Sequence, residues 1–184
     1  MTSKNIAVMI GGVAAGMVAS KLIPPLAGAL MGSHRVRTGG DAFALLIDDH
    51  RKIRGLLEQM VAFPTGSMAK RARLFLMLKR KLAKHAMAEE DVVYPIVRND
   101  SAGGDRRKHL YDEHADMKIL LREIEEDVKL GQDWTVHVTA LRDVVLQHIE
   151  EEENTIFPEL RRELSEARQP ELAGQISREE ALVI

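Results

Sequence analysis

After residue 40, hydrophobic residues recur at the spacing of one helix face. In the first stretch this face carries one histidine among apolar residues: Phe43, Leu46, Ile47, His50, Ile53, Leu57 and Met60. Positions i, i+3, i+4 and i+7 lie on the same side of an α-helix. The segment 63–67 contains a proline and a glycine and interrupts the pattern. We therefore predict one helix from Asp41 to this break and a second over about 68–93, ending near Pro95.

The second half of the chain repeats this arrangement. Residues 99–105 contain glycine and aspartate and predict a turn, after which helical periodicity spans roughly 107–130 and then Trp134 to Phe157. A short amphipathic helix is expected after Pro170. Two consecutive helix pairs with short connections predict an all-α fold, an antiparallel up-down four-helix bundle made of two repeated αα-hairpins.

Two polar motifs lie on these helices, and each occurs once in each hairpin. The first is a pair of acidic residues followed directly by a histidine, which is His50 in one copy and His114 in the other. The second motif is a histidine, a glutamate four residues later, and then an aromatic–proline pair. Its copies are His85, Glu89, Tyr94, Pro95 and His148, Glu152, Phe157, Pro158. Because both motifs recur at nearly the same offset along the chain, coincidence explains them poorly.

The spacing of these motifs brings their side chains to one place. Residues four apart stand on the same helix face, so each His–Glu pair can reach one point in the bundle core. Burying such groups without partners costs on the order of several kcal/mol. Nitrogen and oxygen donors of this kind suit Fe, Mn, Co or Zn. The sequence therefore predicts a pair of metal ions held by six residues: His50, His85, Glu89, His114, His148 and Glu152.

Other side chains near these motifs receive different assignments. We expect His109 at the surface, and we expect the acidic run 150–153 to face solvent with Glu152 alone pointing inward. Glu90 is assigned to the solvent in the same way. Tyr111 is expected to face inward, either as ordinary core packing or as a donor or ligand at the metal site. Apolar candidates for the lining of the site are Ile53, Leu56, Leu82, Met87, Met117 and Leu121.

Composition narrows the range of chemistry. The chain has 184 residues, no cysteine and only 4% aromatic residues. These features fit a helical bundle and exclude thiolate metal sites, iron–sulfur clusters and disulfide scaffolds. The net charge is −2, and every acidic residue lies after residue 40. An acidic body without a basic stripe argues against nucleic acid as a partner.

With these motifs, the chain resembles the hemerythrin-like family, the HHE cation-binding domain, over about residues 41–178. The resemblance implies that the four histidines ligate two iron ions per chain and that the two glutamates bridge them. Oxygen-carrying members place a second histidine one turn from the third-helix histidine, where this chain has Leu110 and Lys118. One iron would then lack an imidazole, and its position would be open, or filled by water or by Tyr111.

Three functions are compatible with such a site. The first is a non-haem di-iron protein that binds or senses dioxygen, peroxide or nitric oxide. The second is a di-iron enzyme that decomposes peroxide. The third is an iron-storage or structural metal-binding bundle. The sequence favours the first, and it leaves open whether the protein is an enzyme.

Residues 1–40 form a separate unit ahead of the metal-binding bundle of residues 41–184. Residues 6–32 are mostly apolar, and a membrane-spanning helix needs about 20 apolar residues. Arg35 and Arg37 follow this stretch and would keep the bundle in the cytoplasm, attached to the inner membrane. We therefore expect a membrane anchor, with a cleaved signal peptide or an arm packed on a partner subunit as alternatives.

Overall fold

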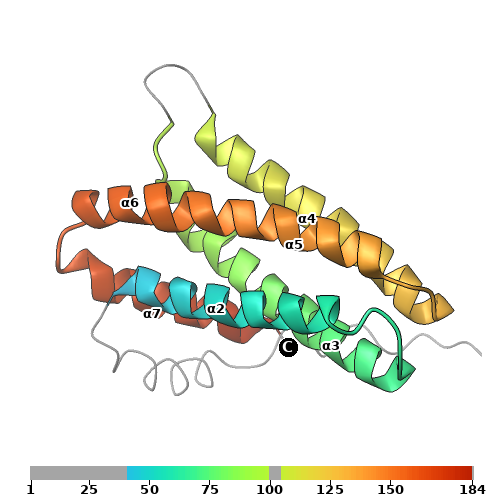
Figure 1. Ribbon diagram of the computed structural model, residues 1–184. Helices are drawn as coiled ribbons and strands as arrows, with labels where there is room; N and C mark the ends of the chain where they lie inside the picture. The colour runs from blue at the N-terminus through green and yellow to red at the C-terminus, as the bar shows by residue number, and fades with distance from the viewer. Residues whose placement is uncertain (1–40, 100–104, 184) are drawn as a thin grey trace, which may run out of the picture.

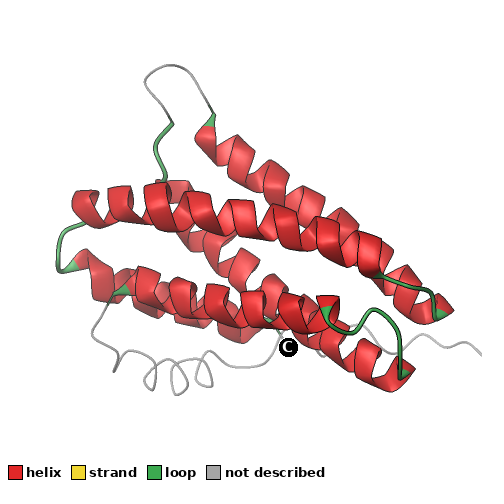
Figure 2. Cartoon of the chain, in the orientation of Figure 1, coloured by secondary structure: helices red, strands yellow, loops and turns green. Residues whose placement is uncertain are grey.

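The computed structural model describes residues 41–99 and 105–183, and every regular element in these ranges is helical (Figures 1 and 2). The elements are α2 (Ala42–Val61), α3 (Met68–Ala88), η1 (Glu89–Val93), η2 (Tyr94–Ile96), α4 (Arg106–Leu130), α5 (Thr135–Glu151), η3 (Glu152–Ile156), α6 (Phe157–Glu163) and α7 (Arg168–Leu182). The prediction of an all-α fold is confirmed. The expected C-terminal helix is present, and it begins at Arg168, so Pro170 lies inside its first turn, where a proline is tolerated.

Four long helices surround the core of the molecule. Helix α2 packs against α3 and α5, and α4 packs against α5 and α3. Figure 1 shows the α2–α3 and α4–α5 turns at the same end of the bundle, with α6 at the other end. Helix α7 lies along α2 and α3, so it covers the outside of the first hairpin.

Residues at the helix ends explain where these helices begin and end. The Asp41 side chain accepts a hydrogen bond from the Phe43 N–H at 3.0 Å and so caps α2. Asp105 caps α4 through the Lys108 N–H, also at 3.0 Å. Helix α4 stops at Gly131, whose φ of 67° is a left-handed conformation that glycine adopts without strain. The predicted starts and stops therefore correspond to actual caps.

The core consists of two hydrophobic clusters with a polar layer between them. One cluster lies toward the α6 end and includes Phe43, Leu46, Ala88, Leu110, Ile156 and Phe157. The other lies toward the hairpin turns and includes Ile53, Leu57, Leu78, Leu82, Met117, Trp134, Leu141 and Val145. On α2, α3 and α4, a buried histidine separates the residues of one cluster from those of the other, and the histidine of α5 lies near the end of that helix beside the second cluster. The polar layer is thus shielded by apolar side chains at both ends.

Each of the two His–Glu motifs ends in a wide π-helical turn. The turns are η1 and η3, which begin at Glu89 and Glu152. The N–H of Tyr94 donates a hydrogen bond to the carbonyl of Glu89, and in the second copy the N–H of Phe157 donates to the carbonyl of Glu152. The following proline offers no N–H and would clash with the carbonyl four residues earlier, so a regular α-helix cannot continue through it. The sequence repeat is therefore also a repeat of backbone geometry.

The π turn changes the direction in which the aromatic residue points. On a regular helix Tyr94, nine residues after His85, would point about 180° away from it. A π turn takes up one residue more than an α turn, which rotates the residues that follow it back toward the core. As a result Tyr94 and Phe157 are both fully buried, with 0% of their surface exposed.

The predicted anchor of residues 6–32 lies outside the described residues. Within residues 41–99 and 105–183, no helix combines the length and the apolar character that crossing a membrane requires.

Candidate metal centre

All six residues singled out by the repeat lie together between the two hydrophobic clusters. His50 and His85 form one group with both glutamates, and His114 and His148 form a second group with Glu89. Within each group the donor atoms lie within 4.8 Å of one another. The structure thus brings together two adjacent half-sites, one from the first hairpin and one from the second.

The two glutamates contact both groups. Glu89 places Oε1 2.9 Å from His85 Nε2 and Oε2 3.5 Å from His114 Nε2. Glu152 lies in the corresponding way, with Oε2 3.2 Å from His50 Nε2 and Oε1 3.4 Å from Nε2 of the α5 histidine. Each carboxylate therefore turns one oxygen toward each half-site, which is the placement of a bridging ligand.

Several donor atoms of this cluster are buried without a hydrogen bond to any residue that the structure describes. They are His50 Nε2, His85 Nε2, both carboxylate oxygens of Glu89 and Oε2 of Glu152. Buried polar atoms without partners are rare and costly in folded proteins. A metal ion would satisfy all of these atoms, and the nitrogen and oxygen donors suit iron, manganese, cobalt or zinc. The residues present therefore fit a pair of metal ions.

The electrostatics of the cluster favour positive charge. Burial alone lowers the pKa of His50, but Glu152 and Glu89 outweigh it and raise that pKa to about 10. The same opposition between burial and the carboxylates of Glu89 and Glu90 raises the pKa of His114 to about 9. Burial raises the pKa of Glu89, but the neighbouring imidazoles outweigh it and hold the pKa well below its usual range. Protons or metal cations must balance the two buried carboxylates.

In three of the four histidines, the ring nitrogen that faces away from the cluster contacts a further carboxylate. In each case a glutamate from another helix lies at hydrogen-bond distance from Nδ1, which leaves Nε2 pointing into the cluster. Such contacts fix the orientation of a metal-binding imidazole. The pairs are His50 with Glu153 at 2.8 Å, His114 with Glu90 at 2.9 Å, and His148 with Glu113 at 2.7 Å.

The assignment of Glu90 and Glu153 to a solvent-facing surface was wrong. Both are partly buried, and each contacts a histidine of the opposite hairpin. Helix periodicity predicts only which side of its own helix a residue occupies, and a long side chain at the flank can still reach a neighbouring helix. The repeat itself carried the missed signal, because Glu90 and Glu153 both stand five residues after the motif histidine.

The fourth histidine breaks this symmetry. This fourth histidine is His85. In the repeat, Asp49 corresponds to Glu113, so a contact between Asp49 and His85 would correspond to the contact of Glu113 with the α5 histidine. Asp49 forms an ion pair with Lys81 of α3 instead. His85 Nδ1 accordingly has no hydrogen bond to any described residue. Aspartate is one methylene shorter than glutamate, which accounts for the shorter reach of this carboxylate.

A tyrosine lies at the site, but it is Tyr94 and not Tyr111. The Tyr94 hydroxyl is 2.9 Å from His114 Nε2, 3.3 Å from His148 Nε2 and 3.2 Å from Glu152 Oε1. Burial and the charge of Glu152 raise the pKa of Tyr94 well above its usual range, so this hydroxyl stays protonated and serves as a hydrogen-bond donor. Tyr111 is 40% exposed, and its hydroxyl donates to the Glu90 carbonyl instead. The expectation that Tyr111 faces inward was wrong, because the ring of Tyr94 occupies the core beside the histidines and the ring of Tyr111 packs outside it, edge to face.

Comparison with known proteins agrees with this geometry. The profile of the hemerythrin HHE cation binding domain matches residues 41–160. The chain belongs to this family. A protein of Nostoc sp. (strain PCC 7120 / SAG 25.82 / UTEX 2576) called "DNA nickase" is 34% identical over 117 residues, which is 64% of this chain and 32% of that protein. The chain thus matches about a third of the length of this relative, and no solved structure matches it significantly.

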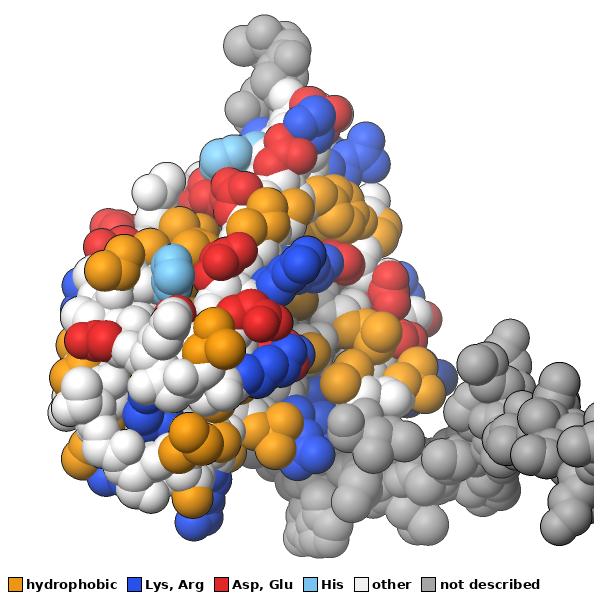
Figure 3. Space-filling model, turned by 90° about the vertical axis from the view of Figure 1, so that its right-hand side faces the viewer, with side chains coloured by type: hydrophobic (Ala, Val, Ile, Leu, Met, Phe, Trp, Pro, Cys, Tyr) orange, Lys and Arg blue, Asp and Glu red, His pale blue; other side chains and the backbone are white. Residues whose placement is uncertain are grey.

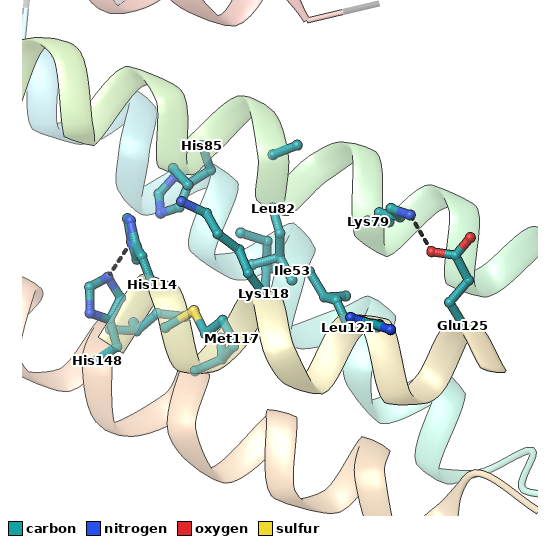
Figure 4. Close-up of a pocket in the computed structure, with 15 residues that line it drawn as sticks. Ile53, Lys79, Leu82, His85, His114, Met117, Lys118, Leu121, Glu125 and His148 are labelled. Carbon is teal, nitrogen blue, oxygen red and sulfur yellow. Dashed lines mark hydrogen bonds and ion pairs between the residues drawn. The ribbon is translucent and has the colours of Figure 1, made fainter. Parts of the chain in front are cut away.

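A cavity of the HHE domain adjoins three of the buried histidines. Lys118, one turn after His114, lines a cavity of about 280 Å³ that also reaches His85 and His148 (Figure 4). The remaining walls are mainly apolar and come from α2, α3, α4 and α5. Of the six predicted lining residues, Ile53, Leu82, Met117 and Leu121 line this cavity. Leu56 and Met87 do not, since Leu56 lies at another surface hollow and Met87 is exposed.

His109 is not part of the buried HHE cluster. Its side chain is 53% exposed, as expected for a surface residue, and its Nε2 lies 3.5 Å from Glu113 and 3.4 Å from Glu151. Glu113 therefore faces His109 on one side and the α5 histidine on the other.

Proposed function

We propose that this HHE domain holds a pair of iron ions and uses them to bind or sense dioxygen, peroxide or nitric oxide. The observation that carries the proposal is the buried cluster of four imidazoles and two carboxylates with a cavity opening onto it. Either feature alone would fit other roles. Together they describe a metal site that a small molecule can reach.

The residues would divide the work as follows. His50 and His85 would hold one ion, His114 and His148 the other, and Glu89 and Glu152 would bridge them. When bound, an iron pair supplies two metals that can exchange electrons with a small ligand. The protein holds the ligand set in place through the carboxylates behind the imidazoles and keeps the surroundings apolar.

Lys118 stands where oxygen carriers have a further histidine, and its amine pairs with Glu90 at 2.9 Å rather than with the cluster. The half-site of His114 and His148 therefore has fewer imidazoles than in an oxygen carrier, and it faces the cavity. This supports an open position at that half-site and argues for sensing or reaction over reversible oxygen transport.

Decomposition of peroxide is a second candidate function, and Tyr94 favours it. Its hydroxyl lies within hydrogen-bond distance of three donor atoms of the cluster and can donate a hydrogen bond there. Cleavage of a peroxide bond builds negative charge on oxygen, and a buried hydrogen-bond donor at the site stabilises that charge. A purely structural or iron-storing bundle would need neither this hydroxyl nor the cavity.

We do not extend the name of the Nostoc relative to this protein. The match covers 32% of that relative, so the activity in its name is not tied to the shared segment. Figure 3 shows acidic and basic side chains interspersed on the face it presents, without a basic stripe. Incubating the iron-loaded protein with supercoiled plasmid tests this reading, and conversion to the nicked form would contradict it.

The main test is metal analysis with optical spectra of the full chain, reduced without air and then exposed to dioxygen, peroxide or nitric oxide. We expect two irons per chain and a charge-transfer band that appears on exposure. The variants His85→Ala and His148→Ala should lose metal and the band. A surface histidine variant, His109→Ala, is the matched control and should keep both. Two zinc ions, or iron without any spectral change, would overturn the proposal.

A further inference from the structure

The cavity beside the metal centre is too large for the diatomic ligands proposed above. Its volume is about 280 Å³, whereas a water molecule occupies about 30 Å³ of liquid and dioxygen is of similar size. The cavity is several times larger than either molecule, and its volume is near the lower limit of about 300 Å³ for sites that bind organic molecules. A channel that only admits gas would not need this room.

The walls of the cavity define the chemistry of its occupant. Figure 4 shows His85, His114 and His148 at one end and the Lys79–Glu125 pair at the other, with Ile53, Leu82, Met117 and Leu121 between them. The lining between the two ends is almost wholly apolar. An occupant that fills the cavity must therefore be mostly hydrocarbon.

Charged side chains line the cavity at both ends, and Lys118, at the end near the histidines, already pairs with Glu90. Arg122 lines the far end of the cavity at its solvent-exposed rim, and within residues 41–99 and 105–183 it forms no ion pair. Lys79 lies nearby, but Glu125 already neutralises it at 2.5 Å. Arg122 is therefore the cation that remains available, and a guanidinium binds a carboxylate through two parallel hydrogen bonds.

The distance between the two ends sets the length of the occupant. His114 and Arg122 are eight residues apart on α4, which corresponds to about 12 Å along the helix axis. An extended hydrocarbon chain of about ten carbon atoms has this length.

We infer that the cavity binds a medium-chain fatty acid, with its carboxylate at Arg122 and the end of its hydrocarbon chain against His85, His114 and His148. The inference deepens the proposed function, because it names an organic ligand for the open side of the same metal centre. The binding itself depends on the apolar walls and Arg122, not on which metal is bound.

Isothermal titration of the full chain with sodium decanoate tests this inference, using both zinc-loaded protein and protein treated with chelator. We expect saturable binding at one site per chain in both forms, with decylamine binding at least tenfold more weakly because its head is cationic. Arg122→Gln should weaken decanoate binding about tenfold or more. Arg107→Gln removes the same charge from the exposed start of α4 and should leave binding unchanged.

A second variant pair tests the position of the chain. Leu121→Trp places a larger side chain in the cavity and should reduce decanoate binding at least tenfold. Ile119→Trp makes a comparable change on the outward face of the same helix, where Ile119 is 60% exposed, and should have no effect.

Three results would overturn the inference: no saturable binding by the wild type, equal binding of decylamine, or equal behaviour of the cavity and control variants. Metal analysis and optical spectra of separately iron-loaded protein distinguish the two proposals. A chain that binds decanoate but holds no iron pair retains this site and loses the proposed function.

Discussion

Removing the hydroxyl of Tyr94 should destabilise the protein mainly when its metal site is empty. The substitution Tyr94→Phe is sterically mild, since Phe157 occupies the corresponding position of the second repeat and packs there with 0% exposure. What is lost is a buried donor lying 2.9 Å from His114 Nε2, 3.3 Å from His148 Nε2 and 3.2 Å from Glu152 Oε1. The consequence depends on whether another partner is available for these atoms.

The magnitude follows from the charge of these partners. Hydrogen bonds to charged groups contribute about 1.5–3 kcal/mol, and a buried acceptor left without a donor costs a similar amount. We expect the free energy of unfolding of the chelator-treated variant to fall by about 2 kcal/mol, roughly a thirtyfold change in the unfolding equilibrium. With metal bound, the ion takes over these donor atoms, so the loss should stay below about 1 kcal/mol.

Urea unfolding followed by circular dichroism, with chelator and with saturating zinc, measures both values. Zinc accepts the same donors and undergoes no redox chemistry, which keeps the transition reversible. Tyr111→Phe is the control, because its hydroxyl contacts only the Glu90 carbonyl and its ring is 40% exposed. The free energy of unfolding of Tyr111→Phe should fall only slightly, both with chelator and with zinc. If Tyr94→Phe costs the same with and without zinc, the hydroxyl does not share partners with the metal and the reasoning fails.

Three further predictions concern the same centre and its support. The pKa values of His50 and His114 in the folded protein are raised from 6.5 to about 10 and about 9. Protonation of these two histidines therefore stabilises the metal-free fold fully below pH 6.5, and this contribution is lost as the pH rises through about 9 to 10. Chelator-treated protein should thus be less stable to urea at pH 10 than at pH 7. Zinc binding at pH 7 should release protons, so the heat measured by titration calorimetry should depend on the buffer. Equal heats in all buffers would contradict these pKa values. Glu113→Gln should weaken zinc binding about 10- to 100-fold in competition with a chelating dye, while Glu151→Gln, which contacts no buried histidine, should not. Leu141→Ala, at a fully buried core position, should lower the free energy of unfolding by about 2–5 kcal/mol, and a loss below about 1 kcal/mol would mean that the core refills the space.

The aromatic–proline pairs show where sequence reasoning stopped. Their repetition was visible, but on a regular helix Tyr94 points about 180° away from His85. The π turn that begins at Glu89 is a response of the backbone to Pro95 and to core packing. Helix periodicity instead predicts an inward position for Tyr111, which stands one turn before His114 on an uninterrupted helix.

The acidic residues around the histidines show a second limit. Glu90 and Glu153 are out of phase with the ligand stripe of their own helices, so periodicity assigned them to solvent. Their partners lie on helices of the opposite hairpin, at 2.9 Å and 2.8 Å. Contacts of this kind depend on how two hairpins dock, which no pattern within one helix contains.

By itself, the sequence determined the all-helical fold, the family and which six side chains gather in the core. Each of these follows from local rules, because helical spacing fixes which residues share a face, and buried donor atoms require a common partner. The tertiary structure decided which carboxylate supports which imidazole, which tyrosine enters the site, and that a cavity of about 280 Å³ opens beside it. Those properties depend on the relative placement of helices that are far apart along the chain, and only packing sets that placement.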